Sequence, residues 1–248
     1  MISIITVVNH RRTYEQYLYP SLLRQTGVDP EIIEIDNTGG QYTSLGDAYR
    51  AAEGQIHGEW LLFVHPDVVF EKENDLACFL SEAERTQKES PEYKLWGAAG
   101  AKAGERKEVV TRIIQGPERE KRDCGFHREA IVEVQTVDAC CFLMPRETYE
   151  TFGFSTSLRG FHLLAEELCL RIAASGGKIG VLPIELWHLS PGSSLDYRYY
   201  LETLRVFRLH PELNSLNTTS FHWERNGKLY WQLRYLAIRN YVHHRLRG

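Results

Sequence analysis

Short apolar runs alternate along the chain with segments in which apolar residues recur at helical spacing. The runs are β-branched or aliphatic, which is typical of strands buried on both faces of a sheet. In the first half of the chain the predicted strands are residues 2–8, 31–36, 60–64 and 94–102. The predicted helices between them are residues 14–25, 44–53 and 75–85. This alternation predicts an α/β fold with a mostly parallel sheet and right-handed crossovers.

The second half of the chain continues the pattern less regularly. Residues 103–129 are rich in charge and glycine, so we expect a loop with a weak strand at 109–114. Alternation or short apolar runs predict strands at residues 131–137, 139–144 and 179–182, with residues 187–190 on a loop. Helical spacing predicts helices at residues 163–175, 196–209 and 228–247. The last two helices form an extension after the sheet.

The composition is that of an ordinary globular protein. Hydrophobic residues make up 43% and charged residues 25%, with a formal net charge of −4. No apolar run is long enough to span a bilayer, and the N-terminus lacks the basic region of a signal peptide. The five cysteines include the adjacent Cys140 and Cys141 but no C-x-x-C. These features favour a reduced, cytoplasmic protein with one domain and an appendage.

Charge is unevenly distributed between the two parts of the chain. Residues 197–248 contain nine Lys and Arg against three Asp and Glu, a net of +6, so the first 196 residues carry −10. A basic tail indicates contact with something anionic, or with the acidic body of a second copy, unless it is only a solvated helix. Residues 228–247 mix aromatic and basic residues. They could lie peripherally on the inner face of a membrane, or pack on the domain or in a homodimer.

Two carboxylates, Asp36 and Asp67, follow predicted strands directly. Ligands of α/β sheets bind beyond the carboxyl ends of the strands, so these residues indicate a site. The chain has neither G-x-G-x-x-G nor G-x-x-x-x-G-K-[ST], which argues against a dinucleotide dehydrogenase and a P-loop NTPase. No glycine-rich loop with Arg and Lys follows the first strand, which argues against a nucleotidyltransferase. A metal ion could hold phosphate instead.

Residues 59–68, with the sequence EWLLFVHPDV, resemble the strand and D-x-D-type element of glycosyltransferase family 2, often written H-x-D. Later segments are similar, in order and spacing, to the acceptor half of these enzymes. These segments are residues 137–143, 152–154, 160–162, 166–171, 177–181, 188–190 and 192–193. The resemblance covers about residues 2–194. It implies a GT-A domain at residues 1–194, followed by a helical extension at 195–248.

The resemblance also implies an activity. Family members transfer a sugar, with inversion, from a nucleoside-diphosphate sugar to a hydroxyl group of an acceptor, usually with Mn²⁺ or Mg²⁺. We expect a role in cell-surface glycan assembly, with a glycan or lipid-linked acceptor and no nucleic acid partner. The metal would neutralise the leaving diphosphate. Carboxylate and imidazole groups suit such a metal, and Asp67 and His188 resemble the family's ligands, with His65 as a further candidate.

Each of these residues also has a structural interpretation. Asp67 could be a solvated turn residue, His188 could pack beside Trp187, and His65 could only shape the turn before Pro66. The resemblance implies that Asp36 is the carboxylate that reads the nucleobase and that Asp138 binds donor or acceptor sugar. Asn9 and Arg11 follow the first predicted strand and could line the nucleotide pocket. The alternatives are an Asx-turn for Asp36, a solvated loop for Arg11 and a strand-end cap for Asp138.

Inversion requires a general base that accepts the proton of the acceptor hydroxyl. Family members carry Asp in the helix that begins near residue 163, where this chain has Ala165 and Glu167. Glu167 lies at the flank of the helix's apolar stripe and Glu166 lies nearly opposite it. We therefore expect Glu167 to be the catalytic base and Glu166 to be a surface or acceptor-contact residue. Because Ala165 departs from the pattern, the alternative is a GT-A-fold protein that binds nucleotide sugars without turnover.

Overall fold

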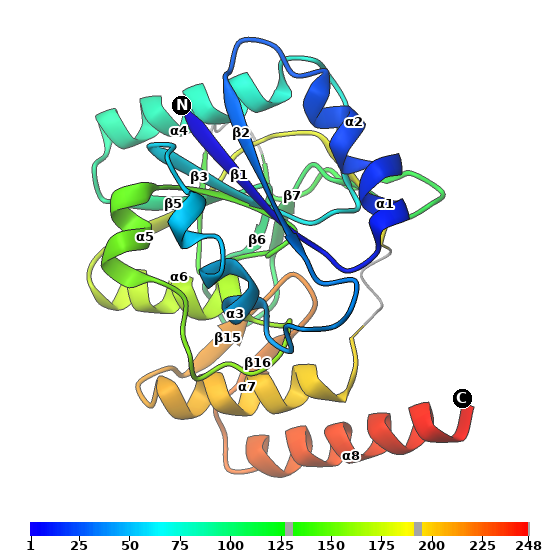
Figure 1. Cartoon of the computed structure of the whole chain (residues 1–248). Coiled ribbons are helices and arrows are strands. Elements are labelled where there is room, and N and C mark those ends of the chain that lie inside the picture. Colours follow the sequence, from blue (N-terminus) through cyan, green and yellow to red (C-terminus); the bar gives the residue numbers. More distant parts are fainter. Residues whose placement is uncertain (127–130, 191–194, 248) are drawn as a thin grey trace.

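The computed structural model describes residues 1–126, 131–190 and 195–247 (Figure 1). Its centre is a seven-stranded sheet with the strand order β10-β13-β5-β12-β3-β1-β2. Five strands run parallel, and β10 and β12 run antiparallel to them. The strands are β1 (Ile2–Val8), β2 (Pro30–Asp36), β3 (Trp60–Val64), β5 (Tyr93–Gly97), β10 (Val132–Val134), β12 (Cys141–Pro145) and β13 (Lys178–Val181). The predicted mostly parallel α/β sheet is confirmed.

Helices cover both faces of this sheet, as the apolar strands require. The helices are α1 (Arg11–Gln16), α2 (Leu18–Leu23), α3 (Leu45–Arg50), α4 (Asp75–Glu89), α5 (Arg146–Phe152), α6 (Leu164–Ala174), α7 (Tyr197–Leu209) and α8 (Leu229–Arg247). Ile5 and Val7 of β1 belong to a core cluster with α3, α5 and α6, whereas Ile2 and Ile4 belong to a second cluster with α1, α2 and α4. A short 3-10 turn, η1 (Glu53–Gln55), follows α3.

Three smaller β structures lie beside the main sheet. One sheet has the order β11-β6-β7, a second has the order β4-β14-β8-β9, and β15 pairs with β16 as a hairpin. Their strands are β4 (Val68–Phe70), β6 (Ala99–Ala101), β7 (Val109–Thr111), β8 (Ile114–Gln115), β9 (Glu120–Lys121), β11 (Thr136–Val137), β14 (Leu186–His188), β15 (Ser215–Asn217) and β16 (His222–Glu224). The prediction of a loop at 187–190 was therefore wrong for its first two residues, and the hairpin was not predicted.

The single helix predicted at residues 14–25 is two short helices, α1 and α2, that meet at Tyr17. Pro20 explains the break. In a continuous helix its nitrogen would have to donate to the carbonyl of Gln16, but proline has no N–H and its ring collides with that carbonyl. Pro20 instead occupies the first turn of α2, where an N–H needs no helical partner.

The strand predicted at 94–102 is divided at Ala98 into β5 and β6, which belong to different sheets. The strand predicted at 131–137 is divided in the same way at Gln135. The division depends on Gly97, because a Cβ atom there would lie 2.6 Å from Cβ of Val137. Without a side chain at residue 97, β11 approaches β5 closely.

The C-terminal helices form as predicted, and α7 joins the core cluster of α6 through Tyr199, Leu204 and Phe207. Figure 1 shows α8 outside α7, at the edge of the molecule. The predicted boundary at residue 194, with Gly192 and Ser193, lies outside the described residues, so the division into two domains stays a prediction. Among the described helices, none is long and apolar enough to cross a bilayer.

The contact at Gly97 generates a prediction about stability. Gly97→Ala should lower the free energy of unfolding by about 1–3 kcal/mol, because the added methyl group overlaps a buried side chain. For a chain of this size each kcal/mol lowers the thermal midpoint by about 2–4 °C. Gly54→Ala is the matched control, since a Cβ atom there meets nothing within 4 Å. Equal thermal midpoints for the two variants in calorimetry would contradict this account.

Candidate functional site

A cavity of about 1160 Å³ opens at the carboxyl ends of β1 and β3. Asn9 and His10 line it directly after β1, and His65 and Asp67 line it directly after β3. Other parts of the wall come from residues near the start of α6 and α7 and from the turn at 218–221 between β15 and β16. Residues of the segments 107–124, 138–140 and 188–190 line it as well. Segments far apart in the sequence therefore meet at the edge of the sheet where α/β folds bind ligands.

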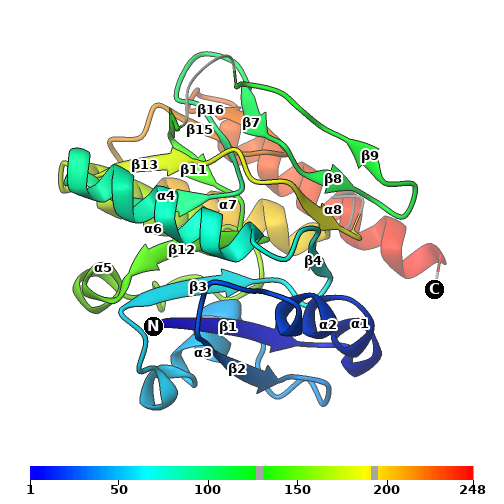
Figure 2. The same ribbon diagram turned by 90° about the horizontal axis from the view of Figure 1, so that it is seen from above.

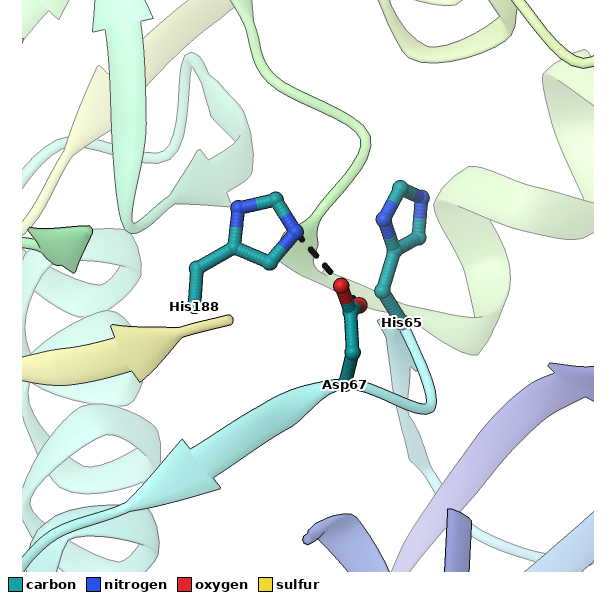
Figure 3. Close-up of side chains that lie close together, drawn as sticks. All are labelled: His65, Asp67 and His188. Atoms are coloured by element: carbon teal, nitrogen blue, oxygen red, sulfur yellow. Dashed lines mark ion pairs between the residues drawn. The ribbon is translucent and has the colours of Figure 1, made fainter. Parts of the chain in front are cut away.

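Three of the predicted residues, His65, Asp67 and His188, come together in this cavity (Figure 3). β3 ends at Val64, and the chain turns so that the N–H of Val68 donates to the carbonyl of His65 at 3.2 Å. β4 then pairs antiparallel with β14, with Val68 opposite His188. This register brings His188 to Asp67, although 120 residues separate them in the sequence.

The three side chains lie within reach of a single ion. One ligand atom from each lies within 4.8 Å of the other two, and Nε2 of His188 lies 3.4 Å from Oδ1 of Asp67. The backbone fixes Asp67, because the N–H of Ser190 donates to Oδ2 at 3.2 Å and that of Leu189 donates to the Asp67 carbonyl at 3.0 Å. The cluster is thus held by the segment that follows β14.

Electrostatics favour the metal-binding forms of two of these groups. Burial opposes the charge of Asp67, but the contacts with His188 and His65 outweigh it and lower its pKa to about 2. Burial lowers the pKa of His65 and keeps this imidazole neutral. Burial also opposes the charge of His188, yet the neighbouring Asp67 raises the pKa of this imidazole.

The cluster fits a divalent cation. Nε2 of His188 is buried and has no hydrogen bond of good geometry to any residue that the structure describes. Metal ligands must be deprotonated, and Asp67 and His65 already are at neutral pH. One carboxylate with two imidazoles is a donor set that Mn²⁺ accepts and that suits Mg²⁺ less well.

Asp138 lines the same cavity, directly after β11. Its Oδ1 accepts the N–H of Cys140 at 2.9 Å, so the predicted strand-end cap is present. Its Oδ2 accepts the hydroxyl of Thr219 at 2.5 Å. Burial opposes the charge of Asp138, but these two hydrogen bonds prevail and lower its pKa. Asp138 is therefore a fixed, charged group in the wall of the cavity.

The expected orientation of the two glutamates of α6 was wrong. Glu166, expected to be a surface or acceptor-contact residue, is buried and lines the cavity, so it is not on the surface and its contact with an acceptor stays a prediction. Glu167, expected at the cleft, is not among the described lining residues and is only 2% exposed. Both its oxygens accept from Nε of Arg171 at 3.0 Å, and Oε1 lies 3.3 Å from Nε2 of His210. The flank of the helix that was expected to face a cleft is covered by the end of α7.

Glu166 has an unusual environment. Its Oε2 is buried without a hydrogen bond to any described residue. Burial, with a smaller contribution from the charge of Asp138, raises the pKa of Glu166 to about 8. At neutral pH this carboxyl group therefore remains largely protonated, beside the ionised Asp138.

Of the three residues predicted to bind the nucleotide, one lines the cavity and two are not among its described lining residues. Asn9 lines the cavity, and its Oδ1 accepts Nδ2 of Asn37 at 2.6 Å. Asp36 is exposed and forms the alternative Asx-turn, with Oδ1 accepting the N–H of Thr38 at 2.9 Å. Arg11 pairs with Glu34 at 2.5 Å and lies 3.8 Å from Asp36. Neither Asp36 nor Arg11 is among the described lining residues, so their binding role stays a prediction.

Several lining residues were missed or discounted in the sequence. His162 was not a candidate site residue, but it lines the cavity with its Nε2 3.3 Å from Oδ1 of Asp196. Thr219 was not considered, although the polar run Asn217-Thr218-Thr219-Ser220 between Leu216 and Phe221 is a signal for a polar turn. Tyr199 and Tyr200, an aromatic pair at the start of α7, also line the cavity.

Solved structures with a similar architecture are known, although sequence comparisons find no match. No protein-family model matches the chain, and no curated protein sequence matches it. Among solved structures, the mannosyltransferase PcManGT from Pyrobaculum calidifontis, in complex with GDP-Man and Mn²⁺, is similar with a TM-score of 0.58 at 13% identity. GalNAc-T7 with UDP, GalNAc and Mn²⁺ is similar with a TM-score of 0.56 at 12% identity. TarS from S. aureus is similar with a TM-score of 0.55 at 14% identity.

These similarities extend over most of this chain but only part of the others. They cover 86%, 84% and 84% of this chain, and 64%, 47% and 38% of the mannosyltransferase, GalNAc-T7 and TarS chains. The identities are low, so the similarity concerns architecture. The mixed α/β architecture of this chain, with its mostly parallel central sheet and flanking helices, matches that of these structures. The chain therefore has the GT-A fold of nucleotide-sugar glycosyltransferases.

Proposed function

We propose that this chain is a metal-dependent glycosyltransferase that moves a sugar, with inversion, from a nucleoside-diphosphate sugar to a hydroxyl group. The main support is the cluster of His65, Asp67 and His188 in a large cavity that Glu166 also lines. The fold supports it too, since the similar mannosyltransferase and GalNAc-T7 structures contain Mn²⁺ with GDP-Man or with UDP and GalNAc.

In this proposal Asp67, His188 and His65 hold Mn²⁺ or Mg²⁺. When bound, the cation supplies Lewis-acid neutralisation of the diphosphate that leaves. The chain's own contribution is to keep Asp67 ionised and fixed by the N–H groups of residues 189 and 190. A diphosphate held by these residues would lie in the part of the cavity beyond the ends of β1 and β3, which Asn9 also lines.

We assign the general base to Glu166 in place of Glu167. The acceptor oxygen attacks the anomeric carbon, its proton passes to the carboxylate of Glu166, and the bond from that carbon to the diphosphate oxygen breaks. Glu166 lines the cavity and has an oxygen without a partner among the described residues. Glu167 is occupied by Arg171 and His210.

The remaining assignments complete the proposal. Asp138, held by Thr219 and Cys140, orients a hydroxyl group of the donor or acceptor sugar. Asp36 and Arg11 bind the nucleotide beyond the end of β2. The catalytic domain is residues 1–194 and the extension is 195–248. The reaction belongs to cell-surface glycan assembly in the cytoplasm, with a glycan or lipid-linked acceptor.

A second candidate function is nucleotide-sugar binding without turnover. It is favoured by Ala165 at a position where the similar family carries Asp, and by the raised pKa of Glu166, which keeps the group protonated at neutral pH. Both functions require binding of a nucleotide sugar with Mn²⁺. A panel of such donors, first screened by thermal shift and then assayed for transfer or hydrolysis, separates them, because only the enzyme consumes the donor.

The metal assignment predicts the effect of Asp67→Ala. The variant should lose the Mn²⁺-dependent part of its affinity for UDP or GDP in calorimetry, because the central carboxylate ligand is gone, and it should keep a folded thermal transition. Asp29→Ala, which removes an exposed carboxylate before β2, should bind as the unmodified protein does. Nucleotide binding that needs no metal and is unchanged in Asp67→Ala would contradict the assignment.

The base assignment predicts the effect of Glu166→Gln and a pH profile. Turnover should fall by about 10²- to 10⁴-fold with donor affinity nearly unchanged, since a positioned base contributes this much. In the unmodified protein kcat/KM should rise with pH and level off above about 8, because only the ionised Glu166 accepts a proton.

Glu167→Gln is the matched control for this experiment. It breaks the contacts with Arg171 and His210, so the thermal midpoint should fall. The turnover of the folded variant should stay close to that of the unmodified protein. An inactive but folded Glu167→Gln beside an active Glu166→Gln would reverse the assignment. If Glu166→Gln leaves turnover unchanged, the proposed catalytic role of Glu166 is wrong.

A further inference from the structure

Helix α8 has two apolar faces, of which the described structure covers one. Leu229, Leu233 and Ala237 are buried, and the first two belong to the core cluster that includes α7. About half a turn away, four large apolar residues are exposed at the spacing i, i+4, i+7 and i+11, which aligns them along one side of a helix. This exposed stripe consists of Trp231 (74% exposed), Tyr235 (64%), Ile238 (64%) and Val242 (46%).

Positive charge flanks the exposed stripe on both sides. At about 100° per residue, Arg239 lies on one side of it, and Arg234 and Arg245 lie on the other. All three are exposed, and the guanidinium carbon of Arg245 lies 5.3 Å from the centre of the Tyr241 ring. The sequence has no Asp or Glu after Glu224. The helix therefore presents an apolar strip with one arginine on one side and two on the other, and it has no carboxylate of its own to neutralise them.

We propose that the exposed stripe of α8 docks the protein on an anionic membrane surface. Helices that lie in the membrane interface place Trp and aliphatic side chains at the boundary between headgroups and acyl chains, with Arg on their flanks. Lipid phosphates would then neutralise the arginines. From Trp231 to Val242 the stripe is roughly 16 Å long, at 1.5 Å per residue.

The arrangement of the molecule leaves the stripe accessible to a flat surface. α8 lies outside α7 at the edge of the molecule, and its C-terminal end extends past the rest of the body (Figures 1 and 2). The first 196 residues carry a net charge of −10, so an anionic surface would repel the body and attract only the basic tail. Contact would therefore be confined to the side of α8 that carries the stripe.

A second copy of the chain is the less favourable occupant. Pairing two α8 helices through their stripes would bring the flanking arginines of both copies together, and like charges in contact oppose association. Each α8 offers no carboxylate to relieve that repulsion. An anionic lipid surface supplies the opposite charge on both flanks at once.

Docking through α8 would place the cavity close to the membrane. α7 packs against α8, while Tyr199 and Tyr200 of α7 line the cavity. α7 therefore lies between α8 and the cavity, and the axes of two packed helices are about 8–10 Å apart. The membrane proposal does not depend on sugar transfer, because vesicle binding needs neither donor nor metal.

The test is co-sedimentation of the full chain with vesicles of phosphatidylcholine, with and without about a third of phosphatidylglycerol. We expect binding to the anionic vesicles only. The triple variant Trp231→Ser, Tyr235→Ser, Ile238→Ser should bind at least about ten-fold more weakly, because it removes most of the buried apolar area. Its thermal midpoint should not change, since these side chains are exposed. Leu23→Ser on α2, where the side chain is 64% exposed, is the matched control and should bind normally.

A second variant separates charge from apolar contact. Arg234→Gln with Arg239→Gln should weaken binding by about 25-fold, at about five-fold for each arginine near an anionic surface. High salt should have a similar effect, since it shortens the range of these interactions. The emission of Trp231 should shift to shorter wavelength on the vesicles, and Trp231→Phe should abolish that shift, because the other tryptophans are buried or half-buried.

Three outcomes would overturn the proposal. The first is no binding to anionic vesicles by the unmodified chain. The second is binding that the triple stripe variant retains in full. The third is a dimer in sedimentation velocity that the triple variant dissociates, with no vesicle binding, because a second copy would then occupy the stripe.

Discussion

The pairing of β4 with β14 is the interaction on which the candidate site depends. Only three residues on each strand take part, yet their register places His188 beside Asp67 and lets the following backbone N–H groups hold Asp67 in place. Side chains alternate between the two faces of a strand, so a slip of one residue would turn His188 to the opposite face. The buried strand β3 and the turn at His65 fix one half of this arrangement, and Trp187 helps to fix the other through its hydrogen bond to the carbonyl of Gly116 at 2.9 Å.

The cavity gathers carboxyl groups that would repel one another without their partners. Asp67 is stabilised by two histidines and Asp138 by a hydroxyl and an amide group, whereas Glu166 lacks such a partner among the described residues. The consequence is a division of protonation states, with two groups ionised at neutral pH and Glu166 largely protonated. Such pairs of unlike carboxyl groups are a feature of acid–base sites. The negative charge that remains also makes the cavity attractive to a divalent cation.

The sequence was sufficient for the long strands and helices, because their periodicity is local and strong. The sequence also predicted that His65, Asp67 and His188 form one metal site. That prediction came from the order and spacing of short motifs, which are recognisable although the identity to a similar solved structure is only 13%. The division of the first predicted helix at Tyr17 depends on the missing N–H of Pro20. The division of the strand at Ala98 depends on the close approach of β11 that Gly97 allows. The orientation of Glu166 and Glu167 could not be predicted from the apolar stripe of α6, because the end of α7, which follows some 40 residues later, covers the side that Glu167 occupies.

The ion pair of Glu167 has a consequence for its neighbour. Arg171 contacts Glu167 and also donates to the carbonyls of Phe152 and Gly153, which ties α6 to the end of α5. Adjacent residues of a helix differ in direction by about 100°, so a rotation of α6 that turned Glu166 out of the cavity would also have to break this anchor. The carboxyl group of Glu166 is therefore preorganised by the scaffold behind it, and a ligand that enters the cavity meets it already in position.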